Sequence, residues 1–266
     1  MGGFNSEYLK KAYFSEGYAL GLAFSPMELA EIQGIITSRW LNVLEGVCPD
    51  LVPQFQELGL INYHKLSSPI PHSRIWAKAA RMLGREETDT ILQMDFFRKI
   101  LPAVLGPYDV ADFEGRGFPE LTWRLVRPNE LQDVGPIHKD VWFTDMAKNQ
   151  FPEHKDRVTI WTSVHTEPGL SGLLVVPGSQ SQEVPFHIEE RHGMKKPVLD
   201  VKDEDLNIQM ANMAPGDVIL FNPRMLHGGA VNRGSLCRVS LELTGLVDKS
   251  LLESIGENSY SAQPMN

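Results

Sequence analysis

The fold prediction starts from APGDVILFNPRMLHGGAVNRGSLCRVSLEL, residues 214–243. "PGD" indicates a turn, "VILFN" a buried strand, and "LCRVSLEL" a second strand that follows the turn signal "NRGS". Upstream, from about residue 121, further short β-rich runs follow one another: "LTWRLVR", "GPIHKDVWF", "RVTIWTSVHT", "LSGLLVVPG" and "NIQMANM". A series of short strands separated by Gly- and Pro-containing turns is typical of a jelly roll or barrel.

The first 120 residues have a helical pattern instead. "SPMELAEIQGIITSRWLNVLEG", residues 25–46, opens with a capping box formed by Ser25 and Glu28, and apolar residues then recur at helical spacing. Residues 72–83 and 88–106 predict two more helices. Helices followed by strands indicate an α+β fold, here a jelly-roll core with N-terminal helices packed on one sheet.

A single domain is expected for residues 1–266. Residues 1–120 form its mainly helical part, 121–246 its jelly-roll core, and 247–266 a polar tail. Residues 181–206 are charged and poorly periodic. They are interpreted as an insertion between strands, which either covers the site as a lid or is an ordinary solvated loop.

Composition excludes several classes of protein. The formal net charge of −9 argues against a nucleic-acid binder or a protein of anionic membranes, both of which need a basic surface. No apolar run approaches the roughly 18 residues that a membrane span requires. The two cysteines, Cys48 and Cys237, cannot build a disulfide framework and favour a reducing, cytoplasmic setting. The oligomeric state is left open.

The tripeptide His-Lys-Asp occurs twice, at residues 138–140 and 154–156. In a strand, residues two apart point to the same face, so His138 and Asp140 would aim at one point. Apolar residues flank the first copy and favour a strand there, whereas the second copy lies in the polar, Pro152-containing run "NQFPEHKDR". The first copy is therefore the predicted metal-binding one.

A third ligand must come from elsewhere in the chain. His227 follows the strand "VILFN" and precedes two glycines, a position where a ligand can approach closely. Two imidazoles and one carboxylate on one face of a divalent iron leave open positions, as in non-haem Fe(II) oxygenases. A zinc site more often has four protein ligands, or three protein ligands and a water.

Several of these motifs together resemble the phytanoyl-CoA dioxygenase-like family. They are residues 138–140, "GLSGLLVVPGSQ" at 169–180, "PGDVILFNPRMLHGG" at 215–229, and Arg238. The family comprises Fe(II)- and 2-oxoglutarate-dependent oxygenases with a double-stranded β-helix, a jelly-roll core. The resemblance implies the iron ligands His138, Asp140 and His227, with Arg238 binding the far carboxylate of 2-oxoglutarate.

Two positions depart from the family pattern, and one arginine competes with Arg238. The family often has Ser or Thr two residues after the distal His, where this chain has Gly229, and it has "PGSH" where this chain has Gln180. Arg233 lies in the turn "NRGS" and is the weaker candidate for the carboxylate anchor. A guanidinium on a strand beside the metal suits a carboxylate, because its two parallel donors match the two oxygens.

The resemblance implies a dioxygenase that hydroxylates a C–H bond of a small metabolite. Fe(II), 2-oxoglutarate and O2 would be consumed in a reaction that releases succinate and CO2, with ascorbate as a stimulating reductant. Asp140 favours hydroxylation, desaturation or ring closure over halogenation, because related halogenases carry a small residue at that position. The alternatives are an oxygen-independent jelly-roll isomerase or lyase, and a non-catalytic module that binds 2-oxoglutarate or another ligand.

The candidate substrate pocket is drawn from residues near the metal strand. Of Trp142 and Phe143, one is expected to face the mouth of the site and the other the core, and Trp142 is taken as the pocket residue. Arg127 and Lys139 could bind an anionic group. Trp161 and Ser163 alternate along one strand and could line the pocket.

Overall fold

The computed structural model describes residues 5–252 of the chain, except residues 69, 71, 76, 148–150, 192 and 193. The α-helices are α1 (Ser6–Glu16), α2 (Pro26–Val47), α3 (Val52–Leu58), α4 (His72–Ile75), α5 (Lys78–Arg81), α6 (Arg85–Leu92), α7 (Leu101–Leu105) and α8 (Asp140–Met146). Short 3-10 helices are η1 (Pro49–Leu51), η2 (Leu60–Lys65), η4 (Leu131–Asp133), η5 (Ser179–Ser181) and η6 (Asp203–Asp205), and η3 (Phe96–Ile100) is a π-helix.

The strands form two main antiparallel sheets and one hairpin. They are β1 (Tyr18–Ala23), β2 (Tyr108–Val110), β3 (Thr122–Val126), β4 (Lys155–His165), β5 (Leu173–Val175), β6 (Phe186–Arg191), β7 (Met194–Leu199), β8 (Gln209–Met210), β9 (Asp217–Phe221), β10 (His227–Gly229) and β11 (Arg238–Asp248). The large sheet has the order β1-β9-β4-β11-β2, with β3 also pairing with β11, and the small sheet has the order β10-β5-β8.

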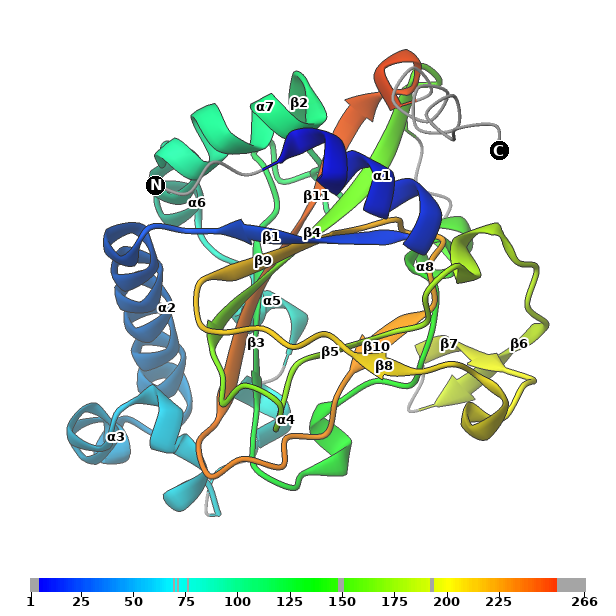
Figure 1. Ribbon diagram of the computed structural model, residues 1–266. Coiled ribbons are helices and arrows are strands. Elements are labelled where there is room, and N and C mark those ends of the chain that lie inside the picture. The colour runs from blue at the N-terminus through cyan, green and yellow to red at the C-terminus, as the bar shows by residue number, and fades with distance from the viewer. Residues whose placement is uncertain are drawn as a thin grey trace, which may run out of the picture.

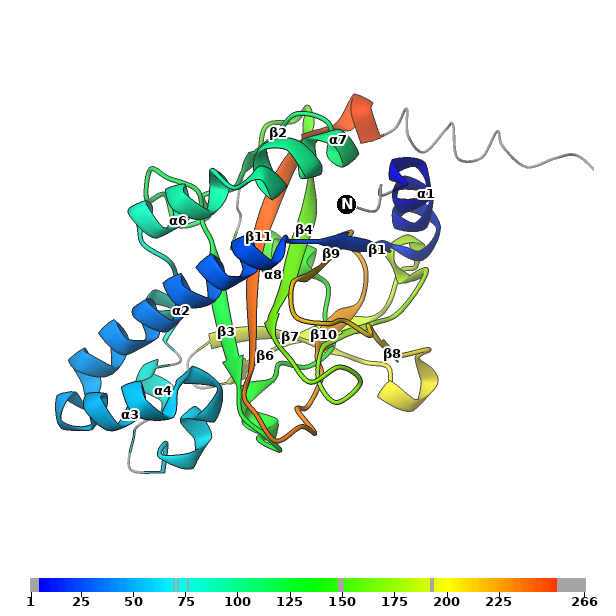
Figure 2. The same ribbon diagram turned by 60° about the vertical axis from the view of Figure 1, so that its left-hand side comes forward.

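The predicted α+β jelly roll is confirmed. Figure 1 shows the small sheet lying against the large one, and in Figure 2 helices α2, α3 and α6 lie on the opposite side of β3, β11 and β4 from β8 and β10. The predicted cap of α2 is present, because the Ser25 hydroxyl accepts from the Glu28 amide and the Glu28 carboxylate accepts from the Ser25 amide. Within the described residues, no helix has the length and apolar character needed to cross a membrane.

Helix α2 holds the outer face of the large sheet through one apolar stripe. Ile32, Ile36, Trp40 and Leu44 recur every fourth residue and are fully buried. Burial of each such side chain stabilises the fold by about 1.5–3 kcal/mol. The Gln33 amide also donates to the Val164 carbonyl at 2.9 Å, which ties the helix to β4.

The large sheet has an outer face toward the helices and an inner face toward the small sheet. On β11, Val239, Leu241 and Leu243 belong to the core shared with the helices. Because successive side chains of a strand alternate, Arg238, Ser240, Glu242 and Thr244 point to the inner face. On β4, Thr159, Trp161 and Ser163 share that inner face. One strand therefore supplies both the core and the interior of the jelly roll.

Two local predictions are wrong, and two segments contain strands that were not predicted. Residues 140–143, predicted as strand, begin α8, and residues 155 and 156, predicted as loop, begin β4. The insertion 181–206, interpreted as a lid or a solvated loop, contains the hairpin of β6 and β7. Strand β1 lies within the part predicted to be mainly helical, where its six residues between two helices are too short to show a clear period.

Each of the two other predicted helices is divided into shorter helices in the structure. Residues 72–83 contain α4 and α5, and residues 88–106 contain the end of α6, then η3 and α7. Pro102 has no amide hydrogen, so the regular helix cannot continue through it unchanged. The wider turn of η3 precedes it and buries both Phe96 and Phe97. Of the predicted tail, β11 includes residues 247 and 248, while residues 253–266 lie outside the described residues.

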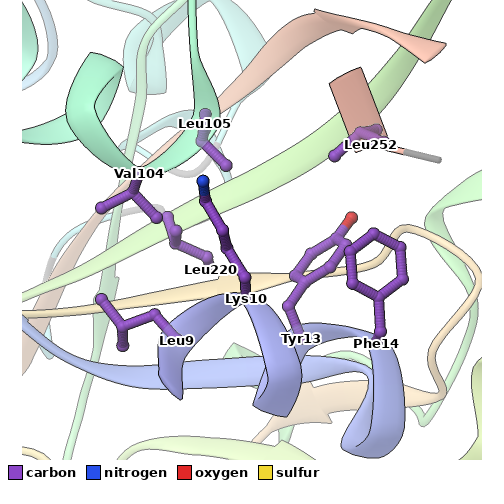
Figure 3. A pocket seen from close by; sticks show the side chains of 8 residues that line it. All are labelled: Leu9, Lys10, Tyr13, Phe14, Val104, Leu105, Leu220 and Leu252. Carbon is purple, nitrogen blue, oxygen red and sulfur yellow. The ribbon is translucent and has the colours of Figure 1, made fainter. Parts of the chain in front are cut away.

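Helix α1 closes the end of the large sheet. Leu9 and Tyr13 point toward Val104, Leu220 and Leu252, and the packing leaves a gap of about 10 Å³ (Figure 3). Such a gap is at the lower limit for holding one water molecule. We therefore regard this place as a packing contact of α1 with α7, β9 and the residues that follow β11.

Candidate metal centre and active site

His138, Asp140 and His227 come together in the structure. Each offers a ligand atom, and these atoms all lie within 4.8 Å of one another. The backbones of His138 and His227 exchange two hydrogen bonds of 2.9 Å, so the segment before α8 pairs with β10. Two parts of the chain that are distant in sequence therefore place their imidazoles side by side, with ring centroids 4.5 Å apart.

Asp140 reaches the same point from the first turn of α8. Its Oδ1 lies 3.3 Å from Nε2 of His227 and 3.7 Å from Nε2 of His138. The backbone is extended at Lys139, and the helix begins at Asp140, where a carboxylate is favoured by the helix dipole. The convergence that the sequence predicted is present, although a strand followed by a helix start produces it.

Hydrogen bonds orient all three side chains. Nδ1 of His138 donates to the Pro136 carbonyl at 2.8 Å, and Nδ1 of His227 donates to the Met225 carbonyl at 3.0 Å. Because the carbonyls can only accept, Nε2 of each ring is left to face the centre with its lone pair. The hydroxyl of Thr159 donates to Oδ2 of Asp140 at 2.7 Å and leaves Oδ1 toward the histidines.

The electrostatics of the group favour a cation at its centre. Burial alone would raise the pKa of Asp140, but the charge and hydrogen bonds of His227 and His138 hold that pKa well below its ordinary value. Burial and the neighbouring His227 lower the pKa of His138, which favours its neutral, metal-binding form. Burial opposes protonation of His227, yet the carboxylate of Asp140 raises its pKa. A carboxylate and two imidazoles thus share a centre that a divalent cation fits.

Arg238 lies close to this centre on the inner face of the large sheet. Its side chain is 2% exposed, and Nη1 donates to the Gly172 carbonyl at 2.9 Å. Nε is buried and has no hydrogen-bond partner among the described residues. Burial, followed by the charge of Arg124, lowers the pKa of Arg238 to about 9. A buried guanidinium with an unused donor is suited to bind an anion.

Gly229 has no side chain, so Arg238 and Val134 pack close to its backbone. A Cβ atom at residue 229 would lie 3.4 Å from Nη2 of Arg238 and 3.2 Å from a methyl group of Val134. Because residue 229 is a glycine, it offers no hydroxyl beside Arg238. The hydroxyl of Ser163, on the inner face of β4, is buried and has no partner in the described part of the chain. Ser163 pairs directly with Ser240, two residues from Arg238.

A cavity of about 240 Å³ lies beside Asp140, and Arg238 is not among the residues that line it. Helix α8 and the strands β4 and β11 supply much of its wall. The lining residues are Lys78, Phe113, Glu114, Asp140, Phe143, Thr144, Ala147, Arg157, Thr159, Pro223, Glu242 and Thr244. Asp140, a candidate metal ligand, forms part of this wall, so a small molecule in the cavity would lie next to the candidate metal centre.

None of the five predicted pocket residues lines this cavity. Trp142 is buried and stacks on Phe186 of the hairpin with ring centroids 4.1 Å apart, while Phe143 lines the cavity. The pair thus divides between core and mouth as predicted, but Phe143 is the residue at the mouth. Lys139 is buried and donates to the carbonyls of Ser179 and Gln182.

Arg127 is also engaged in the protein interior. Its Nε and Nη2 donate to the two carboxylate oxygens of Asp133 at 2.9 and 2.8 Å, and its backbone amide donates to the same carboxylate. Arg127 therefore holds the segment after β3 and does not line the cavity. A sequence pattern does not reveal this pairing, because the two residues are linked by an irregular turn.

The remaining predicted residues lie on β4. Trp161 is buried on the inner face, and the guanidinium of Arg238 lies 5.6 Å from the centre of its ring. Neither Trp161 nor Ser163 lines the 240 Å³ cavity. Both lie on the side of Arg238, so they belong to the surroundings of the anion site.

The second His-Lys-Asp copy lies away from the metal centre. Asp156 is on β4, its carboxylate accepts from the Arg157 amide, and Arg224 is 3.6 Å from it. Thr159 and Glu242 are functional candidates that the sequence analysis missed. The alternation of "RVTIWTS" and "RVSLELT" carries the signal, because both residues share a strand face with a residue that the analysis had selected.

The family model for phytanoyl-CoA dioxygenase (PhyH) matches residues 97–240, more than half of the chain. Comparison with curated protein sequences gave no match.

Three of the solved structures that are similar to this chain bear on its fold. EvdO2 from Micromonospora carbonacea var. aurantiaca, complexed with 2-oxoglutarate, is 16% identical with a TM-score of 0.56, covering 92% of this chain and 92% of that chain. EctD from S. alaskensis, with 2-oxoglutarate and 5-hydroxyectoine, is 16% identical with a TM-score of 0.56, covering 90% and 74%. The non-heme alpha ketoglutarate dependent epimerase SnoN from nogalamycin biosynthesis is 15% identical with a TM-score of 0.53, covering 91% and 80%. At these identities the likeness concerns the fold.

Proposed function

Since the chain belongs to the phytanoyl-CoA dioxygenase (PhyH) family, we propose that it is an Fe(II)- and 2-oxoglutarate-dependent dioxygenase of a small-molecule substrate. The observation that carries the proposal is the convergence of His138, Asp140 and His227 within 4.8 Å. Two imidazoles and a carboxylate are the donor set that non-haem Fe(II) oxygenases use with open coordination positions. We assign residues 1–266 to one oxygenase domain whose helices support the sheet that carries the site.

The residues of this chain fit the metal and the co-substrate. Nε2 of His138 and of His227, with Oδ1 of Asp140, would hold Fe(II). Arg238 would bind the far carboxylate of 2-oxoglutarate, which supplies the partner that its buried Nε otherwise lacks. When bound, Fe(II), 2-oxoglutarate and O2 supply the oxidising power to attack a substrate C–H bond, with succinate and CO2 as co-products.

The protein itself contributes orientation and exclusion of water. Thr159 holds Asp140 through Oδ2, and the backbone carbonyls of residues 136 and 225 hold the imidazoles. The cavity beside Asp140 would place the substrate against the metal, with Phe143 at its wall. We favour hydroxylation as the outcome, because Asp140 keeps the third protein ligand. The epimerase SnoN has a similar fold, so the outcome at the substrate is part of the test.

The test is co-substrate turnover by the purified protein. Protein supplied with Fe(II) and 2-oxoglutarate under air should release succinate slowly even without its substrate, and ascorbate should increase the yield by keeping the iron reduced. Succinate release should require O2 and should be absent from the Asp140→Ala variant. Metal binding without any binding of 2-oxoglutarate would instead support an oxygen-independent isomerase or lyase. Binding of 2-oxoglutarate without turnover would support a ligand-binding module.

A further inference from the structure

Glu242 lies between the two parts of the site. It is four residues after Arg238 on β11, and both side chains point to the inner face of the large sheet. Its carboxylate lines the 240 Å³ cavity together with Asp140. Asp140 belongs to the candidate metal group, so Glu242 faces the region next to that group.

The carboxylate of Glu242 has no direct partner in the structure. Within residues 5–252 as described, it accepts no hydrogen bond and forms no ion pair, although it is only partly exposed. Arg124 and Arg81 act on its charge, yet neither lines the cavity. A partly buried carboxylate loses hydration, and a donor that reaches it from the cavity recovers that loss.

The other charged residues of the cavity are already engaged. Lys78 forms an ion pair with Glu114. Arg157 donates to the hydroxyl of Thr144 at 2.5 Å, and its guanidinium lies 4.6 Å from the ring centre of Phe151. Asp140 is bound by Thr159 and belongs to the metal centre. Among the charged residues of this wall, Glu242 thus stands out as a carboxylate for which the described residues provide no hydrogen bond and no ion pair.

We infer that Glu242 is a specificity-determining residue that accepts a hydrogen bond from an ammonium or hydroxyl group of the substrate. The inference rests on the proposed function and adds the chemical class of the substrate to it. The donor group would be held against β11, the carbon to be oxidised would lie toward Asp140, and Phe113 and Phe143 would enclose the apolar part. An anionic substrate group would be disfavoured at Glu242 by charge repulsion.

The test measures ligand binding and needs no turnover. Protein is loaded with Ni(II) and 2-oxoglutarate, and binding of three matched probes, benzylamine, benzyl alcohol and benzoate, is followed by calorimetry. We expect benzylamine or benzyl alcohol to bind at least about tenfold more tightly than benzoate, since a hydrogen bond to a charged group is worth at least that factor. A preference for benzylamine identifies an ammonium as the donor, and a preference for benzyl alcohol identifies a hydroxyl.

Variants assign the preference to Glu242. Glu242→Gln keeps the size of the side chain and removes its charge, so an amine preference should be lost, whereas an alcohol should be affected less because the amide oxygen still accepts. Glu242→Ala should remove either preference. The control is Asp156→Asn, a carboxylate on the neighbouring strand β4 outside the cavity, which should retain the wild-type order of affinities.

The outcomes separate this inference from the proposed function. Normal binding of Ni(II) and 2-oxoglutarate, combined with equal binding of the three probes, tightest binding of benzoate, or no binding of any probe, would overturn the role of Glu242 alone. An unchanged order of affinities in both Glu242 variants would also overturn it. Wild-type protein that binds Ni(II) but not 2-oxoglutarate would refute the proposed function and this inference with it.

Discussion

His138 and His227 exchange two backbone hydrogen bonds of 2.9 Å, and this short bridge fixes the spacing of their imidazoles. The main chain, more than the side chains, therefore sets the two nitrogen ligands in place. Asp140 completes the group from a different element, the first turn of α8. The metal centre is thus assembled from a β-bridge and a helix start, and each part can be tested separately.

The first prediction concerns the choice between the two His-Lys-Asp copies. Asp140→Ala should abolish Fe(II) binding or weaken it by more than about a hundredfold, because it removes the only carboxylate of the described metal group. Asp156→Ala should retain wild-type affinity, since Asp156 contacts Arg224 and not the histidines. Anaerobic titration with Fe(II) measures both variants. Loss of iron from Asp156→Ala alone would show that the assignment is wrong.

The second prediction concerns the hydrogen bond that orients Asp140. Thr159→Val keeps the shape of the side chain but removes the hydroxyl that donates to Oδ2 at 2.7 Å. Loss of such an outer partner typically lowers metal affinity about 10- to 100-fold. Thr162→Val, on the outer face of the same strand, is the control and should bind Fe(II) normally. Equal affinities of both variants would mean that Thr159 has no role in metal binding.

The third prediction concerns Arg238. Arg238→Ala would leave the far carboxylate of 2-oxoglutarate without its partner in a dry site, which costs about 2–5 kcal/mol, or roughly 30-fold or more in affinity. Arg238→Lys should recover part of the loss, because one ammonium cannot form two parallel hydrogen bonds. Iron affinity should be unchanged in both variants.

Arg233→Ala is the matched control for Arg238. Arg233 is exposed in the turn before β11 and should not affect the dissociation constant of 2-oxoglutarate. That constant is measured anaerobically with iron bound. A normal constant for Arg238→Ala with a raised constant for Arg233→Ala would reassign the anchor.

The fourth prediction concerns the unpartnered hydroxyl of Ser163. If this hydroxyl donates to 2-oxoglutarate, Ser163→Ala should weaken its binding about 10-fold or more, the worth of a hydrogen bond to a charged group. The free energy of unfolding without 2-oxoglutarate should stay the same or rise, since the variant removes a buried unsatisfied group. A purely structural serine would give the opposite pair of results. Ser181→Ala, at an exposed position, should change neither quantity.

The fifth prediction concerns the buried pair of Arg127 and Asp133. Arg127→Met would leave Asp133 buried without its guanidinium, which should lower the free energy of unfolding by about 3–5 kcal/mol. The dissociation constant of 2-oxoglutarate for the folded protein should not change, because the guanidinium of Arg127 is directed to the carboxylate of Asp133 and is not the proposed anchor. Chemical denaturation and calorimetry measure the two quantities. An unchanged stability with weaker 2-oxoglutarate binding would restore Arg127 as a site residue.

The same pair predicts a dependence of stability on pH. Burial would raise the pKa of Asp133, but hydrogen bonds from Arg127 and His72 lower it from 3.8 to about 2. Because the folded-state pKa is the lower one, the stabilisation is complete above the unfolded value of about 4 and is lost as pH falls toward 2. It amounts to about 2 kcal/mol. The difference in unfolding free energy between wild type and Asp133→Asn should therefore shrink as pH falls from 5 to 2.

The sequence predicted the convergence of His138, Asp140 and His227 better than the local structure around them. A His and an Asp two residues apart can meet in a strand, and they also meet here, where the chain is extended at Lys139 and then turns into α8. The spacing of the two residues in the sequence limits the distance between their side chains, but it does not reveal that a helix begins at Asp140. The apolar run "VWF" after Asp140 is compatible with a strand or a buried helix, and the contact of Trp142 with the hairpin decides between them.

The pocket was harder to predict because it depends on pairing between distant strands. Arg127 and Glu242 are both charged residues within β-rich runs. In the structure, Arg127 is held in the interior while Glu242 faces the cavity. This difference follows from the register of β3 and β11 and from the turn that contains Asp133, which the sequence alone does not reveal. The hairpin of β6 and β7 is a similar case, since the apolar alternation of Phe186 and Ile188 is too short to give a clear period within a charged sequence.

The alternation of β11 has a consequence for how this protein can diverge. Val239, Leu241 and Leu243 support the helices, while Arg238, Glu242 and Thr244 point the other way. Mutations at Glu242 or Thr244 can therefore change the accepted substrate while the outward-facing core of the same strand is preserved. Because the two sets of side chains lie on opposite faces of β11, substitutions on the inner face can change the specificity without first requiring mutations that stabilise the core. It also gives a physical reason why proteins 15 or 16% identical to this chain retain its fold.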